Sequence, residues 1–218
     1  LVCVHQARGG LELSQESTAA LVVAVNLNLV AAMTVGVARA GMLSGNGRCH
    51  TLDERADGYV RSEGCLAMLV RLDDGASSSK HASSIVIASS AVRSDGKSAS
   101  LTAPSGLAQQ QLLREALSEA ATSGEIVDND LVPRHVEMHG TGTALGDPIE
   151  IGALSAVSSR RFAPTVGAVK ANVGHSETCS GAFGLCVLGR VALASQQAPP
   201  QACLLQLNSR LSHFADRF

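Results

Sequence analysis

The sequence predicts a layered α/β protein, and three features of the 218-residue chain carry this prediction. Apolar runs with the length and composition of strands occur at residues 20–30, 65–72, 85–92, 135–139 and 166–169. Segments with helical patterns alternate with these runs, which is typical of sheets covered by helices. The first run, ALVVAVNLNLV, is too apolar for either of its faces to lie in water, so we expect both faces to be covered.

Helices are predicted between these strands, over residues 1–7 (the end of an apolar helix), 31–40, 107–122, 147–157 and 181–194. Gly41 marks the stop of the second helix, and the third has the apolar spacing of a surface helix. Asp147 and Pro148 are typical of a helix start, and Asp147 is expected to cap the fourth helix. The last helix is apolar on most sides, which predicts a central position.

Two polar stretches are expected to form loops rather than regular elements. Residues 46–64 are rich in Gly, Arg and Asp. Residues 73–84 are rich in Ser, which predicts an exposed connection and a subdomain boundary.

The composition argues against several classes of partner. With 45% hydrophobic residues the chain can bury a sizeable core, and its net charge of -2 gives no general reason to expect nucleic acid. Aromatic residues make up only 2%, too few for a surface that stacks bases. No apolar run is long enough to span a bilayer. The six cysteines include no C-x-x-C pair, so we expect buried thiols in a reducing compartment rather than disulfides.

The segment VEMHGTGTALGDPIEI at residues 136–151 admits three interpretations. A phosphate loop is disfavoured, because the spacing G-x-G-x-x-x-G and the Thr and His side chains do not suit a dinucleotide site. A metal site is disfavoured because His135, Glu137 and His139 would point in parallel from one face of a strand. Acyl chemistry fits better. A histidine at a strand end can aim a ring nitrogen at a carbonyl oxygen, beside hydroxyls that bind a substrate arm.

A second segment has the same organisation as the first. Residues 166–181 read VGAVKANVGHSETCSG, which is a strand, a polar turn and a helix, with Lys170 and His175 at the turn. A lone buried histidine is more often structural. Two histidines at equivalent strand-to-helix turns favour a functional site.

These two segments resemble the signature motifs of β-ketoacyl synthases. HGTGTALGDPIE (139–150) and VKANVGHSE (169–177) are most similar to the ketosynthase domains of polyketide synthases and type I fatty-acid synthases. Three further segments agree in order: LVCVHQA (1–7), GRCHTLDERADGYVRSEGC (47–65) and SDGKSASLTAPSGLAQQQLLREAL (94–117). The resemblance implies the thiolase fold, a layered αβαβα body. Residues 1–83 would be the end of its N-terminal half, and residues 84–218 its truncated C-terminal half.

The resemblance also implies a reaction, the decarboxylative Claisen condensation. In this family a cysteine holds an acyl group as a thioester, and a malonyl unit on acyl carrier protein loses carbon dioxide and extends it, in polyketide or fatty-acid synthesis. His139 and His175 would stabilise the charge that develops on the malonyl thioester oxygen. Lys170 would tune the site, with Glu177 as its ionic partner.

Substrate binding and partners follow from the same resemblance. Thr141 and Thr143 would hydrogen-bond the phosphopantetheine arm of the carrier protein, and no cofactor or metal would bind the chain directly. Tyr59, Arg61 and Glu63 are expected to brace a loop or a dimer contact. The implied partners are malonyl- and acyl-loaded carrier protein and a second copy of the chain, and the implied location is the cytoplasm.

The sequence departs from the family pattern at both ends. The T-A-C-S-S-S segment of the nucleophile would lie directly before Leu1, and the glycine-rich G-F-G-G-T-N segment is missing. Cys3 and Cys179 stand where the family has small residues and are expected to be inert. We therefore expect an excerpt of a working ketosynthase whose nucleophile lies upstream. The alternative is a truncated, non-catalytic chain that docks a carrier protein or dimerises.

Overall fold

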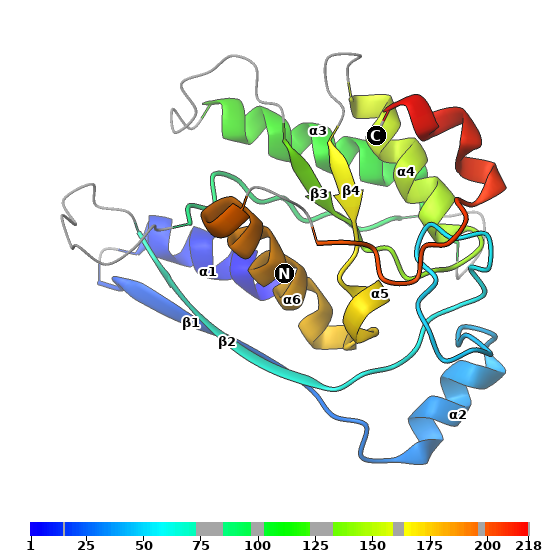
Figure 1. Ribbon diagram of the computed structural model, residues 1–218. Coiled ribbons are helices and arrows are strands. Elements are labelled where there is room, and N and C mark those ends of the chain that lie inside the picture. Colours follow the sequence, from blue (N-terminus) through cyan, green and yellow to red (C-terminus); the bar gives the residue numbers. More distant parts are fainter. Residues whose placement is uncertain are drawn as a thin grey trace.

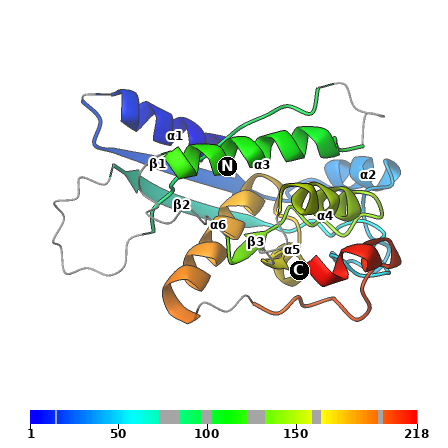
Figure 2. The same ribbon diagram turned by 90° about the horizontal axis from the view of Figure 1, so that it is seen from above.

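A computed structural model of the chain describes residues 1–14, 16–72, 85–96, 103–122, 133–158, 164–195 and 199–217. It is built in layers (Figure 1). A β-sheet, a layer of helices, a second sheet and a second layer of helices follow one another (Figures 1 and 2). The predicted α/β class is therefore confirmed.

The first sheet joins β1 (Ala19–Asn26) and β2 (Gly64–Arg71) as antiparallel neighbours. Both strands were expected from their apolar runs, although β1 ends before residues 27–30. Leu21 on β1 faces Leu69 on β2, and the side chains of both are exposed. The expectation that β1 is covered on both faces is thus not met within the described residues.

The second sheet joins two short parallel strands, β3 (His135–Glu137) and β4 (Thr165–Gly167). Both were predicted, and both end two residues before their apolar runs do, β3 at Glu137 and β4 at Gly167. The turn after each strand carries one of the two predicted histidines, so the parallel pairing places the turns at the same edge of the sheet.

The expected strand at residues 85–92 is wrong, because the structure has no strand there. The reason lies in the hydrogen bonds of Ser90. Its backbone N–H donates to the carboxylate of Glu119, and its carbonyl oxygen lies 3.1 Å from Nδ1 of His5. Side chains from two helices thus occupy backbone groups that a neighbouring strand would otherwise pair with. The predicted exposed connection at residues 73–84 lies outside the described residues.

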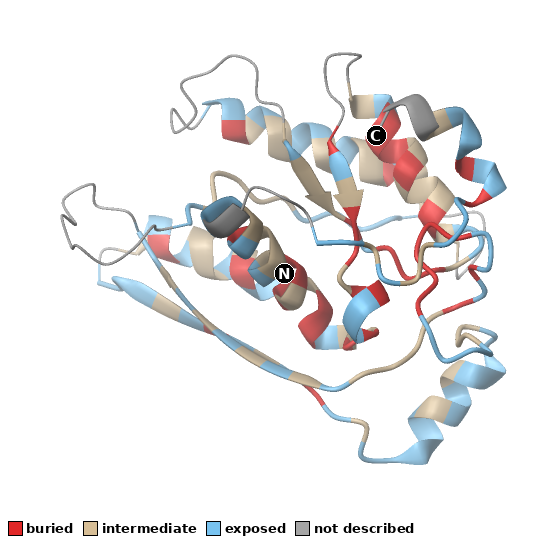
Figure 3. Cartoon of the chain, viewed as in Figure 1, coloured by how far each residue is buried: buried red, intermediate tan, exposed pale blue. Residues whose placement is uncertain are grey.

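The helices are α1 (Val2–Leu13), α2 (Ala31–Arg39), α3 (Gly106–Thr122), α4 (Gly146–Val157), α5 (Lys170–Val173) and α6 (Ser180–Arg190), followed by a π-helical turn at Val191–Ser195. Four helices, α2, α3, α4 and α6, lie within a few residues of their predicted positions, whereas α1 extends beyond the predicted residues 1–7 and the short α5 was expected to be a turn. Helices α1 and α6 lie between the two sheets, which confirms the central place of α6 (Figure 1). By contrast, α2 projects from the body and has no buried residue (Figure 3).

A compact core lies beneath the two polar turns. It contains Leu52, Met138, Ile151, Ala168 and Leu211. These residues come from the long loop at residues 46–63, the position after β3, helix α4, the position after β4 and a C-terminal 3-10 helix at Ser209–Arg217. The core therefore holds the two turns and the loop against one another, which fixes the site described next.

Candidate active site

The first turn, at residues 139–143, is shaped by two glycines in left-handed backbone conformations. Gly140 has φ 45° and Gly142 has φ 74°. A Cβ atom on Gly142 would lie 2.7 Å from the backbone nitrogen of His50, so no larger residue fits there. The G-x-G spacing thus serves a tight approach between the turn and the long loop.

Two carboxylates from α4 hold this turn through its backbone. Glu150 accepts the N–H of His139 at 2.6 Å and that of Gly140 at 3.0 Å. Asp147 is fully buried and accepts the N–H of Gly142 at 3.1 Å and that of Leu52 at 2.8 Å. The predicted cap role of Asp147 is therefore wrong in detail: α4 begins at Gly146, and the carboxylate joins the turn to the long loop instead.

The second turn, at residues 170–176, lies against the same loop. The backbone N–H of His175 donates to the carbonyl of Val60 at 2.7 Å, and the N–H of Ser62 donates to the carbonyl of His175 at 2.9 Å. Gly174 has φ 79°, and a Cβ atom there would meet Ser62 at 3.0 Å. The long loop therefore contacts both turns and sets their relative position.

This arrangement brings the two predicted histidines together. The rings of His139 and His175 have centroids 5.4 Å apart and lie nearly perpendicular, at 83°. The ring of Tyr59, from the long loop, also lies against His175, with the two ring centroids 4.8 Å apart. The side chains of two segments that are far apart in the sequence thus form one cluster, as their strand-to-helix context predicted.

The hydrogen bonds around His175 define its tautomer. The backbone N–H of Glu177 donates to Nδ1 of His175 at 3.0 Å, and the Ser180 hydroxyl lies 2.7 Å from the same nitrogen. A backbone N–H can only donate, so Nδ1 must be the acceptor. In the neutral ring the proton is therefore on Nε2, which leaves one N–H donor available to a bound oxygen.

Electrostatics keep both histidines neutral. Burial, with Lys170 as the next cause, lowers the pKa of His175 to about 4. The surrounding protein also lowers the pKa of His139 to about 4, chiefly by desolvation and then through the charges of Lys170 and His175. At neutral pH both rings are uncharged, so each has one donor nitrogen.

Lys170 lies at the start of α5 and only 4% of it is exposed. Desolvation lowers the pKa of its ammonium group, and the charges of Glu137 and Glu150 oppose that shift. The side-chain carboxylate of Glu137 also accepts the N–H of Val169 at 2.6 Å. These two carboxylates, rather than Glu177, thus act on Lys170.

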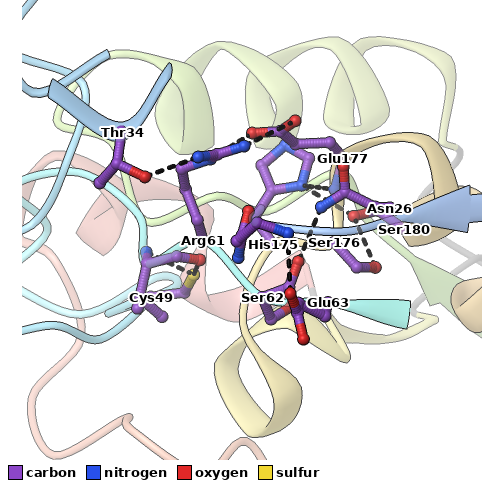
Figure 4. Close-up of polar contacts among 12 residues, drawn as sticks. Asn26, Thr34, Cys49, Arg61, Ser62, Glu63, His175, Ser176, Glu177 and Ser180 are labelled. Atoms are coloured by element: carbon purple, nitrogen blue, oxygen red, sulfur yellow. Dashed lines mark hydrogen bonds and ion pairs between the residues drawn. The ribbon is translucent and has the colours of Figure 1, made fainter. Parts of the chain in front are cut away.

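The expected ion pair between Lys170 and Glu177 is wrong. Glu177 instead bonds Arg61, whose Nε donates to Oε1 at 2.7 Å (Figure 4). Lys170 is surrounded by carboxylates that lie on β3 or α4, whereas Glu177 faces the long loop. The role inferred from the family resemblance thus assigned Lys170 the wrong partner.

The two predicted substrate-binding threonines lie in the first turn. Thr141 is buried, with 7% of its surface exposed. The Thr143 hydroxyl oxygen accepts the N–H of Gly146 at 3.1 Å, which leaves its own proton free to donate. Thr143 therefore has a free hydroxyl proton at the turn, whereas little of Thr141 reaches the surface.

Two cysteines near the histidines have structural surroundings. Cys179 is fully buried, and its thiol donates to the carbonyl of Gly64 at 3.1 Å. Burial raises the pKa of the Cys49 thiol, and its sulfur accepts the N–H of Val60. Neither has the exposed, electropositive setting of a reactive thiol.

Glu150 is a site residue that residue types alone do not reveal. Its signal is its place three residues after Asp147, on the same face of α4, because side chains at that spacing are neighbours.

In the described ranges, no three His, Cys, Asp or Glu side chains come together as a metal site requires. None of the described helices is both long and apolar enough to cross a membrane.

Family models match two adjacent parts of the chain. Residues 1–75 match the model described as "Beta-ketoacyl synthase, N-terminal domain", and residues 84–204 match "Beta-ketoacyl synthase, C-terminal domain". The second match alone covers more than half of the chain.

Curated relatives are much longer than this chain. A phenolphthiocerol/phthiocerol polyketide synthase polypeptide of Mycobacterium tuberculosis is 41% identical over 221 residues, which is 100% of this chain and 10% of the relative. The 6-methylsalicylic acid synthase of Aspergillus niger is 36% identical over 219 residues, which is 97% of this chain and 12% of the relative. The chain thus spans about a tenth of the length of these relatives.

Solved structures share the fold. The ketosynthase from module 6 of the bacillaene synthase of Bacillus subtilis 168 aligns with a TM-score of 0.86 and 32% identity, covering 96% of this chain and 37% of that one. An oxazolomycin ketosynthase domain from Streptomyces albus JA3453 aligns with a TM-score of 0.87 and 29% identity, covering 100% of this chain and 38% of that one.

Proposed function

The chain belongs to the β-ketoacyl synthase family, and from this premise we propose that its two-histidine cluster decarboxylates a malonyl thioester during polyketide chain elongation. One observation carries the proposal. Two neutral imidazole rings lie 5.4 Å apart, and the tautomer of one leaves an Nε2–H donor free. Two such donors suit a single oxygen that gains negative charge.

The chemistry requires stabilisation of an enolate. When the bond between the malonyl carboxylate and its α-carbon breaks, carbon dioxide leaves and the electron pair moves onto the thioester oxygen. Nε2–H of His175 and a donor from His139 would hold that oxygen between them. The α-carbon of the enolate then attacks an acyl thioester, expelling a thiolate and forming the new carbon–carbon bond.

Lys170 and Glu177 have different parts in this proposal. Desolvation is the main cause of the lowered pKa values of both histidines, and the positive charge of Lys170 lowers them further. Glu177 presents its backbone N–H to His175 and is therefore a positioning residue. The acyl thioester would be held by a cysteine other than Cys49 and Cys179, whose thiols are buried and hydrogen-bonded.

The substrate arm would lie along the first turn. Thr141 and Thr143 would hydrogen-bond the amides of a phosphopantetheine arm, and an acyl carrier protein would deliver that arm. Their place beside His139 supports this, since the arm must end with its thioester at the histidines. Pairing of the chain with a second copy remains a prediction from the family.

The proposal is tested by histidine substitutions in the full polypeptide that carries this sequence. His139→Ala and His175→Ala should each abolish release of labelled carbon dioxide from malonyl carrier protein. His213→Ala, which removes an exposed histidine near the C-terminus, is the matched control and should retain full activity. Circular dichroism would confirm that each variant folds. Decarboxylation at the wild-type rate in either active-site variant would refute the proposal.

A further inference from the structure

Arg61 is a buried arginine that the chemistry described so far does not use. Only 7% of its side chain is exposed, although it lies in a loop. Its Nε donates to Oε1 of Glu177 at 2.7 Å, and Nη2 lies 3.4 Å from Oε2 of the same carboxylate. Its Nη1 donates to the Thr34 hydroxyl of α2 at 2.7 Å (Figure 4). A buried guanidinium group whose three nitrogens all bond neighbouring side chains holds those side chains in place.

The residue that Arg61 binds has an unusual backbone. Glu177 has φ 45°, the left-handed region that residues other than glycine seldom adopt. In this conformation its N–H reaches back to Nδ1 of His175 at 3.0 Å. A strained backbone persists only where its surroundings hold it, and the ion pair with Arg61 is the strongest side-chain contact of Glu177.

The backbone of Arg61 supports the same geometry. Arg61 and His175 form an isolated parallel bridge, through the hydrogen bonds of Val60 and Ser62 to His175. The main chain of the loop therefore fixes the backbone of His175, while the side chain of Arg61 fixes the residue that bonds its ring.

We propose that Arg61 is a positioning residue for His175: by clamping Glu177 in its left-handed conformation, it holds the Glu177 N–H on Nδ1 and keeps the proton on Nε2. This inference deepens the proposed function and rests on it for its catalytic consequence. The tautomer itself, however, can be measured without any turnover.

The first test reads the tautomer directly. Long-range ¹H–¹⁵N correlation spectra of the histidine-labelled chain distinguish a ring protonated on Nε2 from one protonated on Nδ1. The wild type should show His175 as the Nε2–H form alone, and Arg61→Gln should show a mixture of both forms. Arg48→Gln, an exposed arginine of the same loop, is the matched control and should match the wild type.

The second test measures malonyl decarboxylation in the full polypeptide. Arg61→Gln should lower kcat about tenfold with a smaller change in KM, which is the effect of losing one oriented hydrogen bond in the transition state. Arg61→Lys keeps the charge opposite Glu177 and should fall between the wild type and the Gln variant. If Arg61→Gln does not fold, Glu177→Gln is measured instead, with the same mixture expected.

The outcomes separate this inference from the proposed function. A single Nε2–H form and an unchanged kcat in Arg61→Gln would overturn the role of Arg61. If His175→Ala retains decarboxylation, the proposed function fails. The tautomer spectra would still decide whether Arg61 positions the ring.

Discussion

The carboxylate of Glu150 accepts the backbone N–H of His139 at 2.6 Å, so a residue on α4 fixes the main chain of a histidine at the end of β3. Its second oxygen accepts the N–H of Gly140. Burial raises the pKa of Glu150, and these two donors oppose that shift. The two carboxylate oxygens of Glu150 thus accept two backbone donors of the first turn.

Replacement of Glu150 by Gln should weaken both the fold and the site. An amide offers one oxygen, and its NH₂ group would face a backbone N–H, so one donor loses its acceptor. We expect a loss of about 2 kcal/mol in the free energy of unfolding, measured by urea titration. Glu16→Gln, at an exposed position, should change it by less than about 0.5 kcal/mol. Equal effects of the two substitutions would contradict the structural role of Glu150.

We expect Thr141 to contribute more to the binding of the substrate than to the rate of the chemical step. Thr141→Val keeps the shape of the side chain and removes its hydroxyl. We expect KM for malonyl carrier protein to rise about tenfold with little change in kcat, because the arm is bound equally in the ground and transition states. Thr122→Val, on the exposed end of α3, provides the control. A fall in kcat at constant KM would place Thr141 in the chemistry instead.

The sequence predicts most of the elements because their signals are local. The alternation of helices and strands follows from apolar runs and end residues, and β1, β2, α2 and α3 lie close to where those signals place them. Residues 85–92 have an equally apolar run and form no strand. A strand needs a neighbour, and here side chains of α1 and α3 bond Ser90 instead. No local sequence pattern indicates whether a segment will pair with a strand or bond side chains of helices.

The site is predictable in its histidines and less so in its ion pairs. His139 and His175 each follow a strand, and parallel pairing of those strands brings them to one edge. The partner of Glu177 could not be chosen from the sequence, because Arg61 lies 116 residues away. Lys170 is closer in sequence and has the same charge, yet the fold turns it toward other carboxylates.

Asp53 should be a strong contributor to stability. It has no exposed side-chain area, and its carboxylate accepts the N–H groups of Leu205 and Gln206 as well as bonds from Arg55. These bonds, with Arg55 as the largest cause, hold the pKa of Asp53 well below its usual range. They join the long loop to the segment that leads into the C-terminal 3-10 helix.

Asp53→Asn should therefore detach that segment, at a cost of about 3 kcal/mol in the free energy of unfolding. Because the pKa of Asp53 is lowered on folding, its stabilising effect is present above the unfolded pKa and is lost only as pH falls toward the folded value. Asp57→Asn, an exposed carboxylate of the same loop, should cost less than about 1 kcal/mol. Urea titration of both variants decides the matter, and a similar loss in each would argue against a special role for Asp53.

The pH dependence of decarboxylation should report the two histidines. Their pKa values are lowered to about 4, so both rings stay neutral as pH falls through 6.5, where an ordinary histidine would gain a proton. Protonation of His175 would place a hydrogen on Nδ1 against the Glu177 N–H and break that bond. We therefore expect kcat to show no histidine inflection near pH 6.5 and to fall as pH approaches about 4.

The lowered pKa values of His139 and His175 should also affect stability, and substitution of Lys170 tests one of their causes. The unfolded histidines bind protons near pH 6.5 and the folded ones do not, so the free energy of unfolding should fall as pH drops from about 6.5 to about 4. Because the charge of Lys170 is one cause of the lowered pKa values, Lys170→Gln should move both ring titrations upward, as followed by NMR. A wild-type titration of either ring near pH 6.5 would contradict this account, since it would mean that neither burial nor Lys170 acts on the histidines as their positions require.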